Sequence, residues 1–388
     1  MSQTQTAATP AQTGRPSGGL DIPKLLLEGR AFFALIVIIL IFSFLSPNYF
    51  SVNNLLTMSA HVAVYAILAV GMLMVILNGG IDLSVGSTVG LAGVIAGFLM
   101  QGVKLPGMEV TLYPAVWVCA VIALAVGAFV GWINGILIAK FGVPPFVATL
   151  GTLYVVRGTA LLITGGLTYP NLRGEAALGN TGFDVLGFNR ILGIPTGVLV
   201  MIVIALLGSF LLNRTAFGRW LYASGGNERA AELSGIPVKK VQIRIYMASG
   251  TCAAIAGVII ASELTSANPT AGTSFELTAI AAVVIGGAAL SGGRGNIRGT
   301  LLGAFVIGFL SDGLVIIGVS EYWQMVFKGA VIVVAVMLNR IEGRSRRIKH
   351  VEAPAAAPPG PSAAGTASPP AGTPPAVDAA DTANPAKP

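Results

Sequence analysis

The chain has 388 residues, of which 54% are hydrophobic and only 10% are charged, and its mean hydropathy is +0.80. A soluble domain carries roughly 25% charged residues, so this composition excludes a water-soluble globular protein. The formal net charge of +7 comes from short basic clusters between apolar segments, without the interleaved aromatic residues of a nucleic-acid-binding surface. We therefore expect a lipid bilayer, and no nucleic acid, as the surroundings of this chain.

Residues 1–30 begin with a polar stretch that has no hydrophobic segment of the kind found in a signal peptide. We expect them to form a largely disordered cytoplasmic tail. The Pro/Ala-rich residues 341–388 are expected to form a second disordered cytoplasmic tail, because this composition cannot bury a core. The transmembrane domain is expected to span residues 31–340.

Ten apolar segments lie between the tails, and most approach the roughly 20 residues that a helix needs to cross a bilayer. The apolar runs are continuous rather than alternating, which excludes a β-barrel. The sequence predicts an all-α, polytopic integral membrane protein with about ten transmembrane helices, some of them short or interrupted. The predicted segments lie near residues 31–46, 54–78, 85–100, 112–139, 145–164, 195–213, 242–262, 276–290, 299–318 and 322–338.

The loops that hold Lys and Arg predict the orientation, because cytoplasmic loops of membrane proteins are enriched in these residues. With a cytoplasmic N-terminus, an even number of crossings also places the C-terminus in the cytoplasm. The inside would then hold most of the basic residues between 140 and 349, and the outside only Lys104, Arg173 and Arg190.

Glycines repeat at four-residue spacing in two of the apolar segments. Gly127, Gly131 and Gly135 form one such row, and Gly299 with Gly303 forms another. Small residues at this spacing allow helix backbones to approach closely in a bilayer. We expect these glycines to serve helix packing and assign them no direct role in transport.

A short sequence pattern occurs twice in the chain. Gly79, Gly80, Leu83, Ser84 and Gly86 recur in the same order and spacing as Gly286, Gly287, Leu290, Ser291 and Gly293. Transporters often interrupt their helices at corresponding points of two halves. The predicted topology places both copies on one side of the membrane, which does not fit an inverted repeat.

The first copy, GGIDLSVGST at residues 79–88, interrupts two apolar segments and carries the carboxylate of Asp82. Asp82 and Ser84 are suited to cap the following helix. Alternatively they line or gate a pathway, since an ionisable residue inside a membrane is a functional candidate. The pathway candidates are Asn78, Asp82, Ser84, Asn134, Asn268 and Glu276, and Arg157 needs either a partner or a water-filled cavity.

Catalytic and metal-binding motifs are absent from the sequence. His61 and His350 are the two histidines, and Cys119 and Cys252 each lie inside an apolar segment. The Gly-rich residues 292–299 lack the Lys-Ser/Thr pair of a phosphate-binding loop. We predict no catalytic residue, no metal and no cofactor, so any ATP must bind to another polypeptide.

Residues 214–241 form the longest loop expected in the cytoplasm, and they predict a short helix. Asn227 is a favoured N-cap residue, Glu228 suits a helix start, and Gly235 followed by Pro237 ends the helix. Such a helix is either a docking element for a partner or an ordinary helix at the membrane surface.

Three segments together resemble the permease subunit of ribose-type bacterial ABC importers: NGGIDLSVGS, GRWLYASGGNERAAELSGI and NPTAGTSFELTAIAAVVIGGAALSGGRGNIRGTLLGAFVIGFL. The resemblance covers nearly all of residues 30–340. In that family the pattern A-A-x-x-x-G marks the helix that docks on the ATPase. The pattern maps onto Ala230, Ala231 and Gly235, with Asn227 and Glu228 just before them. Arg229 stands where the broader importer pattern has Glu, which leaves open which side chain contacts the ATPase.

The resemblance implies a permease of the bacterial cytoplasmic membrane that imports a pentose, a hexose or a related polyol. It also implies three partners: an ABC ATPase subunit, an extracytoplasmic sugar-binding protein, and a second permease copy or close paralogue. One alternative is an ABC permease for branched-chain amino acids or another small polar solute. The other is a secondary transporter without an ATPase.

Overall fold

A computed structural model describes residues 29–104, 107, 109–331, 333–334 and 337. These residues belong to one unit, Met1–Glu342, and the second unit, Gly343–Pro388, lies outside them. The two predicted tails, apart from Gly29 and Arg30, therefore also lie outside the described residues.

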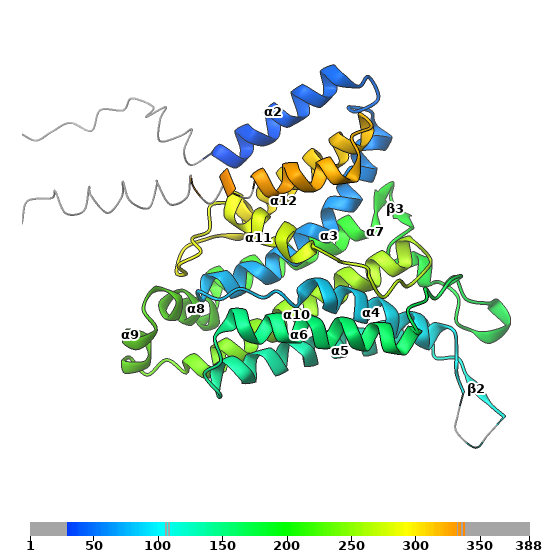
Figure 1. Cartoon of the computed structure of the whole chain (residues 1–388), viewed down its shortest axis with the longest axis horizontal. Helices are drawn as coiled ribbons and strands as arrows, with labels where there is room; N and C mark the ends of the chain where they lie inside the picture. Colours follow the sequence, from blue (N-terminus) through cyan, green and yellow to red (C-terminus); the bar gives the residue numbers. More distant parts are fainter. Residues whose placement is uncertain (1–28, 105–106, 108, 332, 335–336, 338–388) are drawn as a thin grey trace, which may run out of the picture. The chain divides into compact units, whose positions relative to one another are not determined.

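The described part of the chain is mainly helical, with two short β-hairpins in its loops (Figure 1). The longer helices are α2 (Arg30–Leu45), α3 (Val52–Leu77), α4 (Val85–Met100), α5 (Val116–Ala139), α6 (Pro145–Thr164), α7 (Thr196–Arg214), α8 (Ala216–Gly226), α10 (Val238–Glu263), α11 (Phe275–Ile285) and α12 (Ile297–Ile316). The short elements are α9 (Glu228–Leu233), η1 (Ala176–Leu178), η2 (Phe183–Leu186), β1 (Val103–Lys104), β2 (Thr111–Leu112), β3 (Arg190–Ile191) and β4 (Ile194–Pro195). Residues 321–331 are also helical.

Six of the described helices are long and apolar enough to cross a membrane, namely α3, α5, α6, α7, α10 and α12. Three further apolar helices, α2, α4 and α11, are shorter. The described residues are consistent with the predicted polytopic helical membrane protein, but the predicted number of about ten crossings is not confirmed. The predicted segments at 85–100 and 276–290 are indeed short helices. The second of them ends at Ile285 rather than at residue 290, because Gly286 and Gly287 turn the chain.

Helices α3 and α10 lie at the centre of the bundle (Figure 1). α10 packs against α5, α4 and α3, while α3 also packs against α12, α11 and α7. Nearly every residue of α3 from Val62 to Leu77 is buried. This burial explains why the predicted segment is apolar all round, since a helix enclosed by other helices has no polar face.

The glycine row of α5 faces α10. A methyl group added at Gly127, Gly131 or Gly135 would overlap backbone atoms of α10 in each case. Likewise, a methyl group at Gly299 or Gly303 of α12 would overlap the backbone around α11. Both rows therefore permit close approach of helix backbones, as expected from their spacing.

The two copies of the repeated pattern lie against each other. The backbone N–H of Gly293, in the second copy, donates to the carbonyl of Leu77, the last residue of α3, at 2.8 Å. α8 and α9 lie at the same end of the bundle, and the hairpins β1–β2 and β3–β4 lie at the opposite end (Figure 1). We call the end with α8 and α9 the α9 end, and the end with the two hairpins the hairpin end.

Candidate functional site

The first break begins where α3 ends. The backbone N–H of Gly79 donates to the carbonyl of Ile76 at 2.9 Å, and that of Gly80 donates to Val75 at 3.1 Å. This pair of bonds is the Schellman motif, which requires a left-handed residue, and Gly79 supplies it with φ = +82°. α11 ends in the same way, with Gly287 at φ = +91° and Ala288 donating to Val283. Both breaks, after α3 and after α11, thus close a helix with the same motif, but the left-handed glycine is the first of its pair in one copy, Gly79, and the second of its pair in the other, Gly287.

Asp82 lies at the centre of a buried polar network that joins the break to α5 and α10. Only 1% of the surface of Asp82 is exposed to solvent. Its Oδ1 accepts from the backbone N–H and the hydroxyl of Ser84 at 3.0 and 2.7 Å, and its Oδ2 accepts from the hydroxyl of Ser249 on α10 at 2.9 Å. Asn134 of α5 donates to the Ser84 hydroxyl at 2.8 Å.

This geometry differs from a simple helix cap. Ser84 is the N-cap residue of α4, but its side chain accepts no hydrogen bond from the first turn of that helix. Asp82 satisfies the N–H of Ser84 itself and at the same time binds another helix. The carboxylate therefore joins the break to α10, and Ser84 joins it to Asn134 of α5. The expected side-chain cap of α4 by Ser84 is not made.

Two buried polar atoms near this network have no hydrogen-bond partner among the described residues: Oδ1 of Asn134 and the hydroxyl of Tyr246. A methyl group added at Gly80 would overlap the hydroxyl of Tyr246. This hydroxyl therefore lies directly beside Gly80. Leaving such an atom unpaired costs about 1–3 kcal/mol. The network therefore contains unused hydrogen-bonding capacity next to a glycine break.

Asn78, the C-cap residue of α3, contacts the neighbouring helix α8. The hydroxyl of Ser224 donates to Oδ1 of Asn78 at 3.0 Å, and the hydroxyl of Tyr222 donates to the carbonyl of Gly295, in the loop after α11, at 2.8 Å. A methyl group at Gly225 would overlap the carbonyl of Leu77. α8 therefore contacts both breaks through direct side-chain and backbone contacts.

α9 begins and ends with the predicted signals. Oδ1 of Asn227 accepts from the N–H of Ala230 at 3.0 Å, as an N-cap residue does. At the other end, the N–H of Gly235 donates to Glu232 at 2.9 Å and that of Ile236 donates to Ala231 at 3.1 Å. Gly235 has φ = +80°, so α9 closes with a further Schellman motif.

One side of α9 is buried and the other is open. Ala231 is buried, and Oε1 of Glu228 accepts from Nε2 of Gln242 on α10 at 3.1 Å. Ala230 is exposed, and Leu233 is 78% exposed. α9 is therefore anchored to α10 while it presents an apolar side chain that has little cover in this chain.

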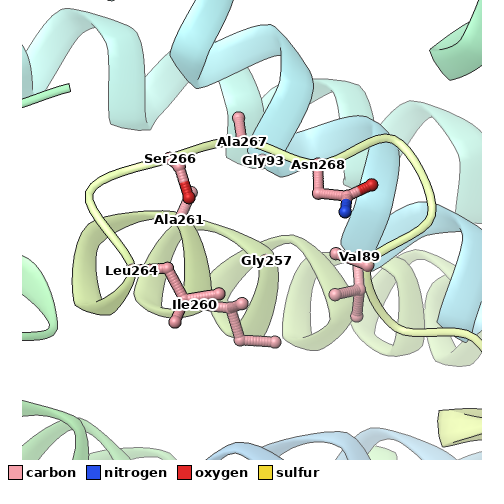
Figure 2. A pocket seen from close by; sticks show the side chains of 10 residues that line it. Val89, Gly93, Gly257, Ile260, Ala261, Leu264, Ser266, Ala267 and Asn268 are labelled. Carbon is pink, nitrogen blue, oxygen red and sulfur yellow. The ribbon is translucent and has the colours of Figure 1, made fainter. Parts of the chain in front are cut away.

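Asn268 lies in the loop 264–274, away from the Asp82 network. Its Oδ1 accepts from the N–H and the hydroxyl of Thr270, both at 2.8 Å. Figure 2 shows this residue at the edge of a small pocket between the loop and the helices α4 and α10. The lining is mostly apolar, with Ser266 and Asn268 as its polar side chains. The enclosed space has room for about one water molecule, so this pocket does not by itself hold a sugar.

Arg157 of α6 finds its partners in backbone carbonyls. Its guanidinium donates to the carbonyls of Pro269 at 2.5 Å, Ala271 at 2.9 Å and Gly86 at 3.3 Å. Glu276 lies close enough to interact with it electrostatically. Arg157 thus fastens the loop 264–274 to α4, and Glu276 lies beside this contact.

The six pathway candidates therefore fall into three groups. Asp82, Ser84 and Asn134 share the buried network, Asn78 contacts α8, and Asn268 and Glu276 lie in or next to the loop 264–274. The sequence did not single out Ser224, Ser249 or Tyr246, because short polar side chains inside apolar segments carry no signal until their partners on other helices are known.

Comparisons with known proteins agree with the helical architecture. The family model described as "Branched-chain amino acid transport system / permease component" matches residues 54–336. No solved structure matches the chain.

Several relatives are sugar permeases by name. The chain is 44% identical over 321 residues to the ribose import permease protein of Escherichia coli K12, covering 81% of this chain and 94% of the relative. It is 44% identical over 314 residues to that of Bacillus subtilis 168, covering 80% and 91%. It is 37% identical over 313 residues to the D-allose transport system permease protein of E. coli K12, covering 80% and 90%.

These relatives are transport subunits rather than enzymes, and the family match over residues 54–336 includes the first break, α8, α9 and the loop 264–274. The predicted resemblance is therefore confirmed. The chain belongs to the ABC permease family described as the branched-chain amino acid transport system permease component, and within it is similar to ribose import permeases.

Proposed function

We propose that this permease imports a pentose, a hexose or a related polyol, with D-ribose as the first substrate to test. The observation that carries the proposal is the similarity of 37–44% identity, over about four fifths of the chain, to relatives named for ribose and D-allose. The family description names branched-chain amino acids, but the individual relatives with sugar names match a larger part of the chain.

The α9 end faces the cytoplasm in this proposal, together with both chain termini. The support is the distribution of charge: Arg214, Arg219, Arg229, Lys239 and Lys240 all lie in or beside α8 and α9, and cytoplasmic loops are enriched in such residues. The hairpin end then faces the external binding protein that delivers the sugar.

The segment 214–241 couples the ATPase to the membrane helices, with Asn227, Glu228, Ala230, Ala231 and Gly235 as the residues that shape and present α9. Support comes from its exposed Leu233 and from the rigid closure of α9 at both ends. Motion of α9 would pass to α8, and from α8 to both breaks through the Ser224–Asn78 and Tyr222–Gly295 hydrogen bonds.

The six pathway candidates then divide among three roles, and Asn78 belongs to the coupling route described above. Asn268 and Glu276 are assigned to the sugar pathway, because they lie in the loop 264–274 and at the start of α11, next to the first turns of α4. Asp82, Ser84 and Asn134 are assigned to a hinge, because their polar atoms are buried and mostly bonded to one another.

The working unit contains two permease subunits, identical or closely related, with an ATPase and a binding protein.

The proposal is tested by ATP-dependent uptake in proteoliposomes that contain the permease with its co-expressed ATPase, supplied with the binding protein. We expect uptake of radiolabelled D-ribose that excess unlabelled ribose suppresses and excess leucine does not. Replacement of ATP by a non-hydrolysable analogue is the control. Leucine uptake would support the amino acid alternative, and ribose uptake without the ATPase would support a secondary transporter.

A further inference from the structure

Three titratable side chains from three different helices meet in the half of the bundle toward the hairpin end. Nδ1 of His61 on α3 lies 3.3 Å from both carboxylate oxygens of Asp312 on α12. Nε2 of the same imidazole lies 3.9 Å from Oε1 of Glu263 on α10. Glu263 is the last residue of α10, which starts next to α9 and runs about 37 Å away from it.

The carboxylates of this cluster are bonded very differently from that of Asp82. Asp82 is buried and accepts three hydrogen bonds of 2.7–3.0 Å. Within the described residues, the side chains of Asp312 and Glu263 have no hydrogen-bond or ion-pair partner other than His61, and those contacts are longer than the usual 2.7–3.2 Å. A carboxylate offers about four acceptor positions, so most of the acceptor capacity here is unused.

The cluster is also accessible. The side chain of His61 is 46% exposed, that of Glu263 is 27% exposed and that of Asp312 is 18% exposed. Ionisable side chains in membrane-spanning helices are costly against lipid and normally face the protein interior or a water-filled cavity. Partial exposure with unused acceptors therefore points to a wet surface that takes a polar ligand.

The surrounding groups suit a hydroxyl-rich ligand. Tyr65, one turn after His61 on α3, lies within electrostatic range of Asp312, and its ring packs edge-on against Phe275 with centroids 5.0 Å apart. Lys328 also lies within electrostatic range of Asp312. No group of three His, Cys, Asp or Glu side chains among the described residues is placed to hold a metal ion. The cluster therefore combines acceptors, donors and aromatic edges.

We infer that His61, Glu263 and Asp312 form a binding site for hydroxyl groups of the sugar as it enters the permease from the hairpin end. This inference rests on the sugar-import function proposed above. Carboxylate oxygens accept from sugar hydroxyls, and His61 keeps the two carboxylates close together so that neighbouring hydroxyls can be bound at once. A few fixed polar groups of this kind set orientation and specificity in small-molecule sites.

The test uses Asp312→Asn and Glu263→Gln, which keep the size of each side chain and remove its charge. Uptake of D-ribose and of ribose analogues that each lack one hydroxyl is measured in the complete reconstituted system. The same binding protein delivers every sugar to every variant. Its preference among the sugars therefore cancels when the uptake of each sugar by a variant is divided by the uptake of the same sugar by the unchanged permease. Glu175→Gln, an exposed carboxylate in the loop between α6 and α7, is the matched control.

In the unchanged permease, the hydrogen bond between the cluster and one sugar hydroxyl should contribute about tenfold to uptake, in addition to any preference of the binding protein. The uptake penalty for the analogue that lacks this hydroxyl should therefore be at least about threefold smaller in Asp312→Asn or Glu263→Gln than in the unchanged permease, while the control keeps it. Thermal stability and ATPase co-purification should stay unchanged.

Equal reduction of all sugars by both variants would overturn the inference, since that pattern indicates a purely structural role for the cluster. Unchanged penalties in both variants would overturn it as well. If the unchanged permease transports none of the sugars with ATP and binding protein present, the proposed function itself fails, which is a different result from either of these.

Discussion

The hydroxyl of Ser224 on α8 donates to Oδ1 of Asn78 at the end of α3, at a distance of 3.0 Å and across 146 residues of sequence. This bond connects the segment assigned to ATPase coupling with the first glycine break. Replacement of Ser224 by Ala removes the donor with little change in volume. A bond of this kind contributes about 1 kcal/mol, equivalent to roughly fivefold in an equilibrium.

We therefore expect Ser224→Ala to lower the amount of sugar transported per ATP hydrolysed by about two- to fivefold, with normal ATPase co-purification. Ser234→Ala is the matched control, because the hydroxyl of Ser234 bonds only within its own turn, to Ala230 at 2.9 Å. A normal transport ratio in Ser224→Ala would contradict the proposed route through Asn78.

Asp82→Asn should preserve both folding and uptake within about twofold. The amide oxygen can still accept from Ser84, and the amide N–H can donate to the Ser249 hydroxyl in place of the bond that Oδ2 accepts now. Asp82→Leu leaves buried donors unpaired, which costs about 1–3 kcal/mol for each group, so it should lower the melting temperature clearly. Uptake and thermal unfolding in detergent measure both. A stable Asp82→Asn protein without uptake would show that the charge itself is required.

Gly235→Val should separate insertion from coupling. Gly235 has φ = +80° and no neighbour within 4 Å of an added Cβ, so the effect comes from the backbone alone. A β-branched residue in the left-handed region costs at least roughly 1–2 kcal/mol, and the closing turn of α9 should shift. We expect normal membrane insertion with weak ATPase co-purification.

Gly235→Asn is the control for this variant, because Asn adopts left-handed geometry more readily than other residues. It should keep most of the ATPase binding and uptake. Loss of binding in the Asn variant to the same extent as in the Val variant would show that the backbone conformation is not the cause.

Gly131→Ala should weaken the contact between α5 and α10. A methyl group at this position would overlap the backbone carbonyl of Tyr246, so the two helices must separate. Gly151→Ala in α6 is the matched control, since nothing lies within 4 Å of its added Cβ. We expect a lower melting temperature and lower yield of folded protein for the first variant, and values unchanged or slightly raised for the second. Equal behaviour of the two would contradict close packing at Gly131.

The sequence predicted the local features of this fold far better than its long-range contacts. Asn227 and Gly235 delimit α9 as expected, because capping depends only on residues within one turn. Asp82 was identified as important, but its bond to Ser249 spans 167 residues and depends on which helices are neighbours. Serine inside an apolar segment looks the same whether it bonds to its own helix or to another.

The Arg157 contacts illustrate the same limit. The sequence indicated that this cation needs a partner or a water-filled cavity. In the structure, Glu276 is a carboxylate close enough to interact with it electrostatically. The structure instead gives it three backbone carbonyls as hydrogen-bond partners. Carbonyl groups are present at every residue, so no residue type along the chain could have indicated them.

The burial of α3 has a consequence for how this protein meets different membranes. Of an apolar 18-residue window in α3, 83% is buried, against 22–28% of the corresponding windows in α5, α6 and α7. A change in bilayer thickness acts on helices at the cost of fractions of a kcal/mol per Å, and it therefore acts on those three outer helices. The part of α3 from Val62 to Leu77, which ends at the first break, has almost no surface on which lipid chains can act.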